Sequence, residues 1–180
     1  MKNCIALVTT ILTLALFGSP LYAQYDGKAK MKTGADIVDV AASSKMHTTL
    51  VAAVKAADLV KTLQKPGPFT VFAPTNAAFD KLPEGTVATL LLEDNKAQLQ
   101  ALLTYHVVPG KVTAAQVVEA IKAGNGTATL TTVNGAELQA IAEGNAVYLV
   151  DQNGNRAQVF ETDLKASNGI IHVIDTVVMP

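Results

Sequence analysis

The apolar residues of this chain change their spacing part-way along it, and this change restricts the possible folds most. Between residues 36 and 64 they recur three and four positions apart, as at Ile37, Val40 and Ala41, which is typical of amphipathic helices. Later in the chain, short alternating runs are separated by three dipeptides of the hairpin-turn kind: Asn134-Gly135, Gly144-Asn145 and Asn153-Gly154. Helices followed by strands in this order predict an α+β fold.

The first 23 residues have the pattern of a secretory signal peptide. Lys2 supplies a positive start, residues 5–17 form an apolar run, and Ala23 is a small residue suited to cleavage. The apolar run is shorter than the roughly 20 residues that a membrane span needs. We therefore expect cleavage near Ala23, a flexible leader over residues 24–35, one domain over residues 36–180, and no membrane span.

The use of cysteine and of charge narrows the function classes further. The single cysteine, Cys4, lies in the predicted signal peptide, so the mature chain would have neither a disulfide nor a thiolate nucleophile. Export without cysteine favours a secreted or periplasmic bacterial protein. The net charge is −1 and no basic cluster is present, which excludes a nucleic-acid binder. A monomer is the expected state.

Three stretches of the chain resemble the fasciclin domain family. Residues 70–79 read TVFAPTNAAF, residues 103–110 read LTYHVVPG, and residues 168–175 read NGIIHVID. Their order and separation are also similar to those of the family. The resemblance implies two small sheets that form a twisted wedge, with a helical cluster at one edge. It further implies a secreted, non-catalytic adhesion module without a cofactor, which binds a cell-surface protein or polysaccharide.

Several polar and aromatic residues of these stretches have a structural interpretation. Thr75 or Asn76 can cap the helix that follows the first strand, and Phe79 would then pack inward. His172 lies in an apolar strand predicted over Ile170–Val178, which also contains Asp175, so its buried imidazole needs a hydrogen-bond partner.

The resemblance also implies two candidate partner-binding regions. The first is Tyr105 and His106, which the family associates with cell attachment, although the spacing of the neighbouring leucines favours a core position instead. The second is Glu161, Asp163 and Leu164, which resemble an acidic-aliphatic sequence used for integrin contact. An exposed Asp163 carboxylate would suit a receptor that completes a metal coordination shell with it. The alternative is a solvated loop carboxylate.

Other chemistry finds less support in the sequence. The three histidines have no metal-ligand spacing, and Asp151 to Asn155 is better read as a hairpin turn than as a calcium loop. Two further functions stay open. One is a periplasmic carrier of a small apolar ligand, which needs an apolar cavity of about 300 Å³ or more. The other is an extracellular hydrolase, which needs a serine or carboxylate beside His106 in a cleft.

Overall fold

The computed structural model describes residues 34–180, with the exception of residues 84 and 145. The predicted signal peptide and nearly all of the predicted leader lie outside the described residues. At residue 35 the chain is already tied to the domain, because the carbonyl of Ala35 accepts a hydrogen bond from the N–H of Ser167 at 2.9 Å.

Helices form most of the first part of the domain, as the spacing of apolar residues predicts. The segment over residues 36–64 contains α1 (Ile37–Ser43), the 3₁₀ turn η1 (Lys45–His47), α2 (Thr48–Ala56) and α3 (Val60–Leu63). Strand β1 (Phe69–Pro74) follows, and then α4 (Asn76–Asp80), α5 (Thr86–Leu90), η2 (Glu93–Asn95) and α6 (Lys96–Tyr105).

Strands form most of the second part. After β2 (Val107–Pro109) and α7 (Ala114–Ala123), the chain runs through β3 (Thr127–Thr131), β4 (Glu137–Glu143), β5 (Ala146–Val150), β6 (Arg156–Ala166) and β7 (Gly169–Ile174). The expected meander is confirmed, with Asn134-Gly135 between β3 and β4 and Asn153-Gly154 between β5 and β6. Strand β3 had no sequence prediction.

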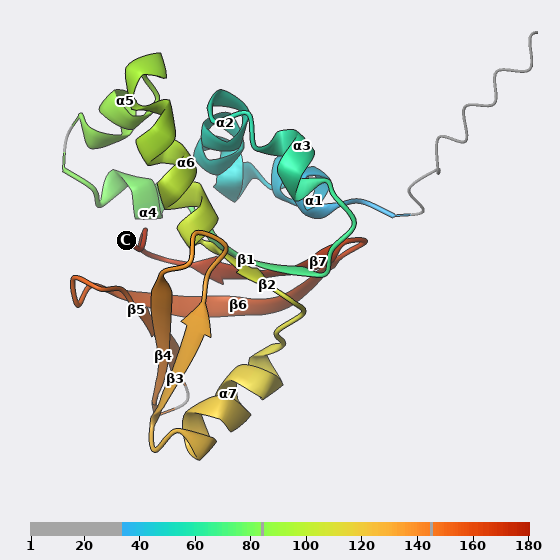
Figure 1. The fold of residues 1–180 in the computed structure, drawn as a ribbon, viewed down its shortest axis with the longest axis vertical. Helices are drawn as coiled ribbons and strands as arrows, with labels where there is room; N and C mark the ends of the chain where they lie inside the picture. The colour runs from blue at the N-terminus through green and yellow to red at the C-terminus, as the bar shows by residue number, and fades with distance from the viewer. Residues whose placement is uncertain (1–33, 84, 145) are drawn as a thin grey trace, which may run out of the picture. The chain divides into compact units, whose positions relative to one another are not determined.

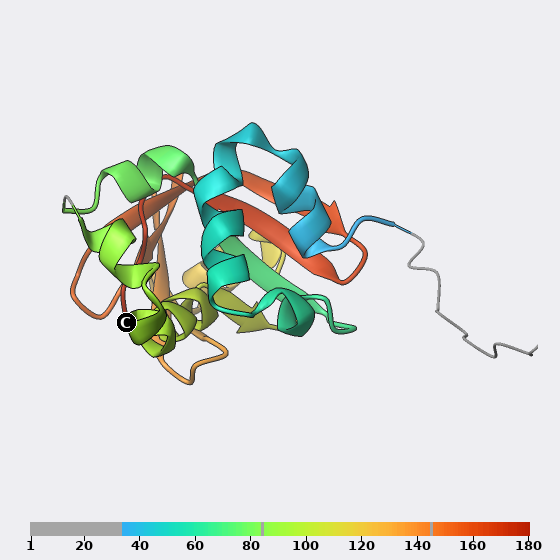
Figure 2. The same ribbon diagram turned by 90° about the horizontal axis from the view of Figure 1, so that it is seen from above.

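The strands of the described part form one seven-stranded sheet in the order β2-β1-β7-β6-β5-β4-β3. The neighbours β1 and β7 are parallel, and all other neighbouring pairs are antiparallel. Helices α1–α6 lie on one side of β1 and β7, whereas α7 and the β3–β5 meander lie on the other side (Figure 1). Viewed from above, α1–α3 and α4–α6 form two neighbouring groups over the sheet (Figure 2). The fold class is therefore α+β, as predicted.

Two apolar clusters lie on opposite sides of the β1–β7 pair. The first, called the helical core, includes Ile37, Leu50, Val54, Leu63, Val71, Phe79, Leu99, Leu103 and Ile171. The second, called the meander core, includes Phe72, Tyr105, Val108, Val117, Ile121, Leu138, Leu149 and Ile174. Because side chains alternate along a strand, β1 and β7 each contribute to both clusters.

Local capping explains where several helices begin. Asp36 and Asp39 form a reciprocal capping box at α1, and Thr113 and Gln116 form a second one at α7. Two other helices begin without such a cap. Pro83 precedes α5 without being part of it, since Gly85 is its N-cap residue. Asn95 makes no side-chain cap at α6 and donates its amide to the carbonyl of Thr89 instead.

Candidate functional site

The acidic-aliphatic sequence from Glu161 to Leu164 lies inside strand β6 and not in a loop. The pairing of β6 with β7 shifts register between Val159 and Glu161 and again between Glu161 and Leu164, so this part of the strand is bulged. Asp163 has a φ of 60°, in the left-handed region that aspartate tolerates better than most residues. The loop interpretation of this sequence is therefore wrong.

The expectation of an exposed Asp163 side chain is also wrong, since this residue is half-buried and has structural contacts. Its Oδ1 accepts a hydrogen bond from the N–H of Ala114 at 3.1 Å. Ala114 is the first residue of α7, where a negative charge is favoured by the helix dipole. The N–H of Asp163 donates to Nδ1 of His172 at 3.4 Å. Asp163 therefore connects the β6 bulge to α7 and β7.

Glu161 and Leu164 lie on the other face of the bulge, beside a groove of about 210 Å³. Helix α1 and turn η1 form the facing wall with Val40, Ala41, Ser43, Ser44, Met46 and His47, and Ala73 and Ile171 contribute from β1 and β7. Glu161 is exposed and Leu164 half-buried. Of the residues predicted for partner contact, these two line a surface groove.

The structure places Tyr105 and His106 in the interior, which favours the core interpretation of this pair. Tyr105 is fully buried, and its hydroxyl donates to the carbonyl of Glu137 at 2.9 Å. His106 Nδ1 lies 2.8 Å from the carbonyl of Leu102, and its Nε2 accepts from the N–H of Val178 at 3.3 Å. A direct surface contact through either side chain is not available in this conformation.

The contacts of His106 also decide against the hydrolase hypothesis. Both ring nitrogens are matched by backbone groups, so no serine or carboxylate occupies the position that a catalytic partner needs. Burial lowers the pKa of His106 to about 4, and the hydrogen bond with Leu102 opposes this only in part. The imidazole is therefore neutral at pH 7 and acts as a fixed part of the core.

The remaining signature residues have contacts within the domain. Thr75 is the N-cap of α4 and accepts from the N–H of Ala78, and Phe79 is buried. Asn76 has a different task, because its Oδ1 accepts from the N–H of Thr49 and its Nδ2 donates to the carbonyl of Lys45. It thereby joins α4 to the start of α2.

His172 and Asp175 connect the C-terminal part of the sheet to other segments of the domain. His172 Nε2 lies 2.9 Å from the carbonyl of Val112, and the ring stacks on Phe72 with centroids 5.6 Å apart. Asp175 accepts from the N–H of Gln158 at 2.8 Å and pairs with Lys81 at 3.1 Å. These contacts join segments that lie far apart in the sequence.

Sequence analysis missed the role of Asn168. Its Oδ1 accepts from the N–H of Ile37 at 3.0 Å, and its Nδ2 donates to the carbonyls of Leu63 and Lys65. The next residue must be glycine, since a Cβ at Gly169 would lie 2.0 Å from the carbonyl oxygen of Phe69. The Asn-Gly pair was visible as a turn signal, but its long-range partners were not.

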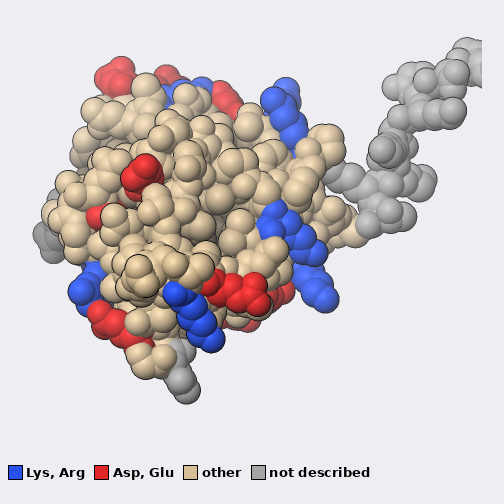
Figure 3. Space-filling model, turned by 60° about the horizontal axis from the view of Figure 1, so that its bottom comes forward, with Lys and Arg blue, Asp and Glu red and all other residues tan. Residues whose placement is uncertain are grey.

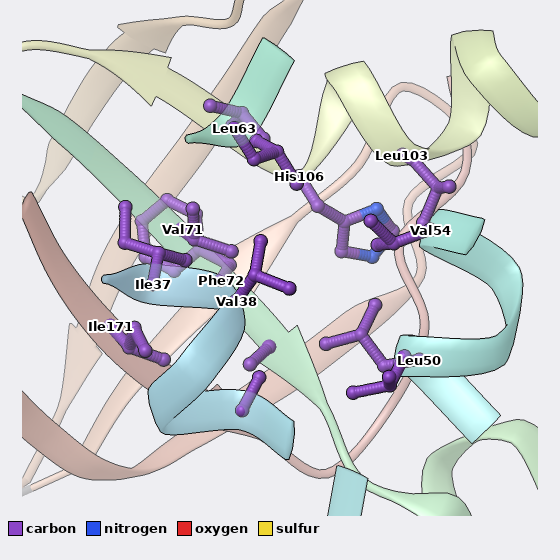
Figure 4. A pocket seen from close by; sticks show the side chains of 14 residues that line it. Ile37, Val38, Leu50, Val54, Leu63, Val71, Phe72, Leu103, His106 and Ile171 are labelled. Atoms are coloured by element: carbon purple, nitrogen blue, oxygen red, sulfur yellow. The ribbon is translucent and has the colours of Figure 1, made fainter. Parts of the chain in front are cut away.

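The interior is too well filled for the carrier hypothesis. The apolar pocket in Figure 4, between helices α1–α3 and strands β1 and β7, is lined by side chains such as Leu50, Val54 and His106. Its free volume is about 30 Å³, a tenth of what the hypothesis needs. A larger hollow of about 350 Å³ is lined by turn residues 66–68 and 166–169 with Lys111, and so is not an apolar interior cavity.

The described residues contain no group of three or more His, Cys, Asp or Glu side chains that could hold a metal ion. Asp151, in the weak calcium-loop pattern, instead accepts from the N–H groups of Asn153, Asn155 and Met179. On the face seen in Figure 3, charged side chains of both signs are scattered over a mostly uncharged surface. Within residues 34–180, no helix is long and apolar enough to cross a membrane.

A family model for the fasciclin domain matches residues 45–180. The chain belongs to the fasciclin family. It is 51% identical over 148 residues to Protein sll1483 of Synechocystis, covering 80% of this chain and 73% of that protein. It is 39% identical over 151 residues to Immunogenic protein MPB70 of Mycobacterium bovis, covering 81% and 69%.

More distant fasciclin relatives are longer proteins. Human periostin is 31% identical over 147 residues, which cover 82% of this chain but 16% of periostin. Among solved structures, a FAS1 domain pair from the insect cell adhesion molecule Fasciclin I matches with a TM-score of 0.72 at 20% identity. That match covers 81% of this chain and 51% of the pair, and it shows that the fold is shared.

Proposed function

We propose that this protein is an exported, non-catalytic adhesion module that binds a cell-surface protein or polysaccharide. Its predicted signal peptide supports export, and its membership of the fasciclin family supports an interaction role. The observation that carries the proposal is how the signature side chains are used. Thr75, Asn76, Tyr105, His106 and His172 are all engaged in internal hydrogen bonds, which leaves recognition to the outer surface.

The surface of the β6 bulge is the proposed contact region. Glu161 is exposed and Leu164 is half-buried beside it, so an acidic and an aliphatic side chain are presented together. Asp163 supports the bulge from behind through its bond to α7, so its contribution to binding is indirect. In this proposal the domain binds its partner as a monomer.

A pull-down from surface extracts of the source organism tests this function. The purified protein, immobilised through its C-terminus, is expected to retain a surface protein or polysaccharide and to promote attachment of cells. Retention of nothing above the level of an immobilised unrelated domain would contradict the adhesion proposal. Mass spectrometry of the exported protein tests the proposed export and signal-peptide cleavage, and Gln24 is expected as the first residue.

A further inference from the structure

The groove between η1 and the β6 bulge contains an unusual buried histidine. His47 is 3% exposed, and its Nδ1 lies 3.0 Å from Oγ of Ser44. No described residue offers a hydrogen-bond partner to its Nε2. Buried polar atoms nearly always have a partner, so an unpaired one in the wall of a groove points to a group supplied from outside.

The local hydrogen bonds favour a donor role for this nitrogen. Oγ of Ser44 accepts from the N–H of Met46, so its own hydrogen is available for Nδ1 of His47. In the tautomer in which Ser44 donates to Nδ1, the ring proton lies on Nε2. Burial lowers the pKa of His47, which keeps the ring neutral at pH 7 although the charge of Glu161 opposes this shift. An acceptor such as a carbonyl oxygen would complete the site.

Glu161 provides a negatively charged hydrogen-bond acceptor at the mouth of the groove. Its carboxylate is exposed, and within the described part of the chain it makes none of the ion pairs. A cationic or N–H group of a partner can therefore approach it without displacing an internal one. The donor in the groove wall, Nε2 of His47, suits a peptide carbonyl. The acceptor at the rim, the carboxylate of Glu161, suits a basic side chain next to that carbonyl.

The size and lining of the groove match a single side chain. Its volume of about 210 Å³ is less than the roughly 300–1,000 Å³ of sites that enclose a drug-sized molecule. Ala73, Leu164 and Ile171 give it an apolar lining. Met46, which is 46% exposed, lies at the same wall and has a flexible, unbranched side chain that can adapt to a bound group.

We propose that this groove binds an extended peptide segment of a partner protein, taking one aliphatic side chain between η1 and β6. The peptide carbonyl accepts from Nε2 of His47, and a neighbouring lysine or arginine pairs with Glu161. This assignment rests on the proposed adhesion function, for which it names a peptide rather than a polysaccharide as the bound chemistry.

Binding of a labelled peptide tests the groove directly. The probe is a fluorescein-labelled Gly-Ser-Lys-Leu-Lys-Ser-Gly amide, and the comparison peptides replace Leu by Gly or both Lys residues by Glu. We expect the Lys-Leu-Lys peptide to bind at least about tenfold more tightly than either comparison peptide. In ¹H–¹⁵N spectra of the full chain, the amides of residues 40–47 and 161–164 should shift.

Two variants alter the groove without touching the core. Glu161→Lys reverses the charge at the rim, and Ser43→Phe places a bulky side chain at an exposed wall position. Each is expected to weaken peptide binding at least about tenfold. Glu119→Lys, the same change at an exposed position of α7, is the matched control and should bind like the unaltered protein. Equal binding by all three variants, or shifts confined to other residues, would overturn the assignment.

The pull-down separates this inference from the proposed function. If Glu161→Lys and Ser43→Phe retain the surface component that the unaltered protein retains, adhesion uses another face and the groove assignment fails alone. If the unaltered protein binds the peptide but retains no surface component, the adhesion proposal fails and the groove stands.

Discussion

The meander core and the helical core differ in how completely their buried polar groups are paired. On the meander side, the hydroxyl of Tyr105, the ring of His172 and the carboxylate of Asp151 all have internal partners. On the helical side, Asn168 is fully engaged, but Nε2 of His47 has no partner among the described residues.

This difference separates scaffold from candidate binding surface within one small domain. An unpaired buried donor costs about 1–3 kcal/mol, and a chain tolerates it where something else is gained. The same region carries the groove and the carboxylate of Glu161, which makes none of the ion pairs found among the described residues. This contrast supports our proposal that the η1–β6 region is the binding surface and that the paired meander side is its scaffold.

The largest effect is expected at Asn168, where the helical side is best paired. Asn168→Ala removes the partners of the Ile37 N–H and of the carbonyls of Leu63 and Lys65. We expect a loss of about 3–4 kcal/mol in the free energy of unfolding, measured by urea denaturation. Asn153→Ala, in an exposed turn, is the control. A loss smaller than that of the control would show that the hydrogen bonds of Asn168 do not contribute to the free energy of unfolding.

A pair of histidine variants tests the comparison most directly. His172→Leu leaves the carbonyl of Val112 and the N–H of Asp163 without a partner, and we expect a loss of about 2 kcal/mol. His47→Leu removes an unpaired donor, so its effect on stability should stay within about 1 kcal/mol of zero. Equal losses for the two variants in urea denaturation would remove the distinction between the two sides.

His106 lies between the two cores and makes the fold sensitive to acid. Its pKa is lowered to about 4 in the folded state by burial, so below pH 6.5 the unfolded chain binds more protons. Stability is therefore complete above pH 6.5 and falls as the pH drops toward 4. The expected loss at pH 5 is roughly 2 kcal/mol.

Thermal unfolding at several pH values measures this dependence. His106→Gln, which keeps a donor and an acceptor but does not titrate, should show a shallower decrease between pH 6.5 and 5. An unchanged pH profile in that variant would assign the acid sensitivity to other groups.

A smaller loss than at Asn168 is expected at Asp163, where the meander side meets the β6 bulge. Asp163→Ala removes the acceptor for the N–H of Ala114 and places alanine at a φ of 60°, so we expect a loss of about 1–2 kcal/mol. Asp163→Asn keeps an acceptor and tolerates this φ, so it should lose less. The melting temperature distinguishes the two variants, and no change for Asp163→Ala would argue against a structural role.

Much of the fold could be predicted because its signals are local. The spacing of Ile37 and Val40, the Thr113–Gln116 capping box and the Asn-Gly turns each act within a few residues. The candidate site could not be found in this way. The position of Asp163 depends on Ala114 and on a strand bulge, both of which arise from long-range pairing.

The groove itself had no signature in the sequence. It brings together Ser44 and His47 from η1, Ala73 from β1 and Glu161 from β6, which no local pattern relates. The family resemblance indicated Glu161 and Leu164 but placed them in a loop. His47 had no predicted role beyond that of a satisfied core or cap histidine, and its unpaired nitrogen is visible only once burial is known.

The position of β7 in the sheet has a consequence for biosynthesis. This strand is the last one along the described residues, yet it lies between β1 and β6, and β1 pairs with β2 on its other side. A nascent chain that has not yet emerged past residue 174 lacks the element that joins the two halves of the sheet. The sheet is therefore expected to form completely only in a late folding step, in which β7 inserts between β1 and β6.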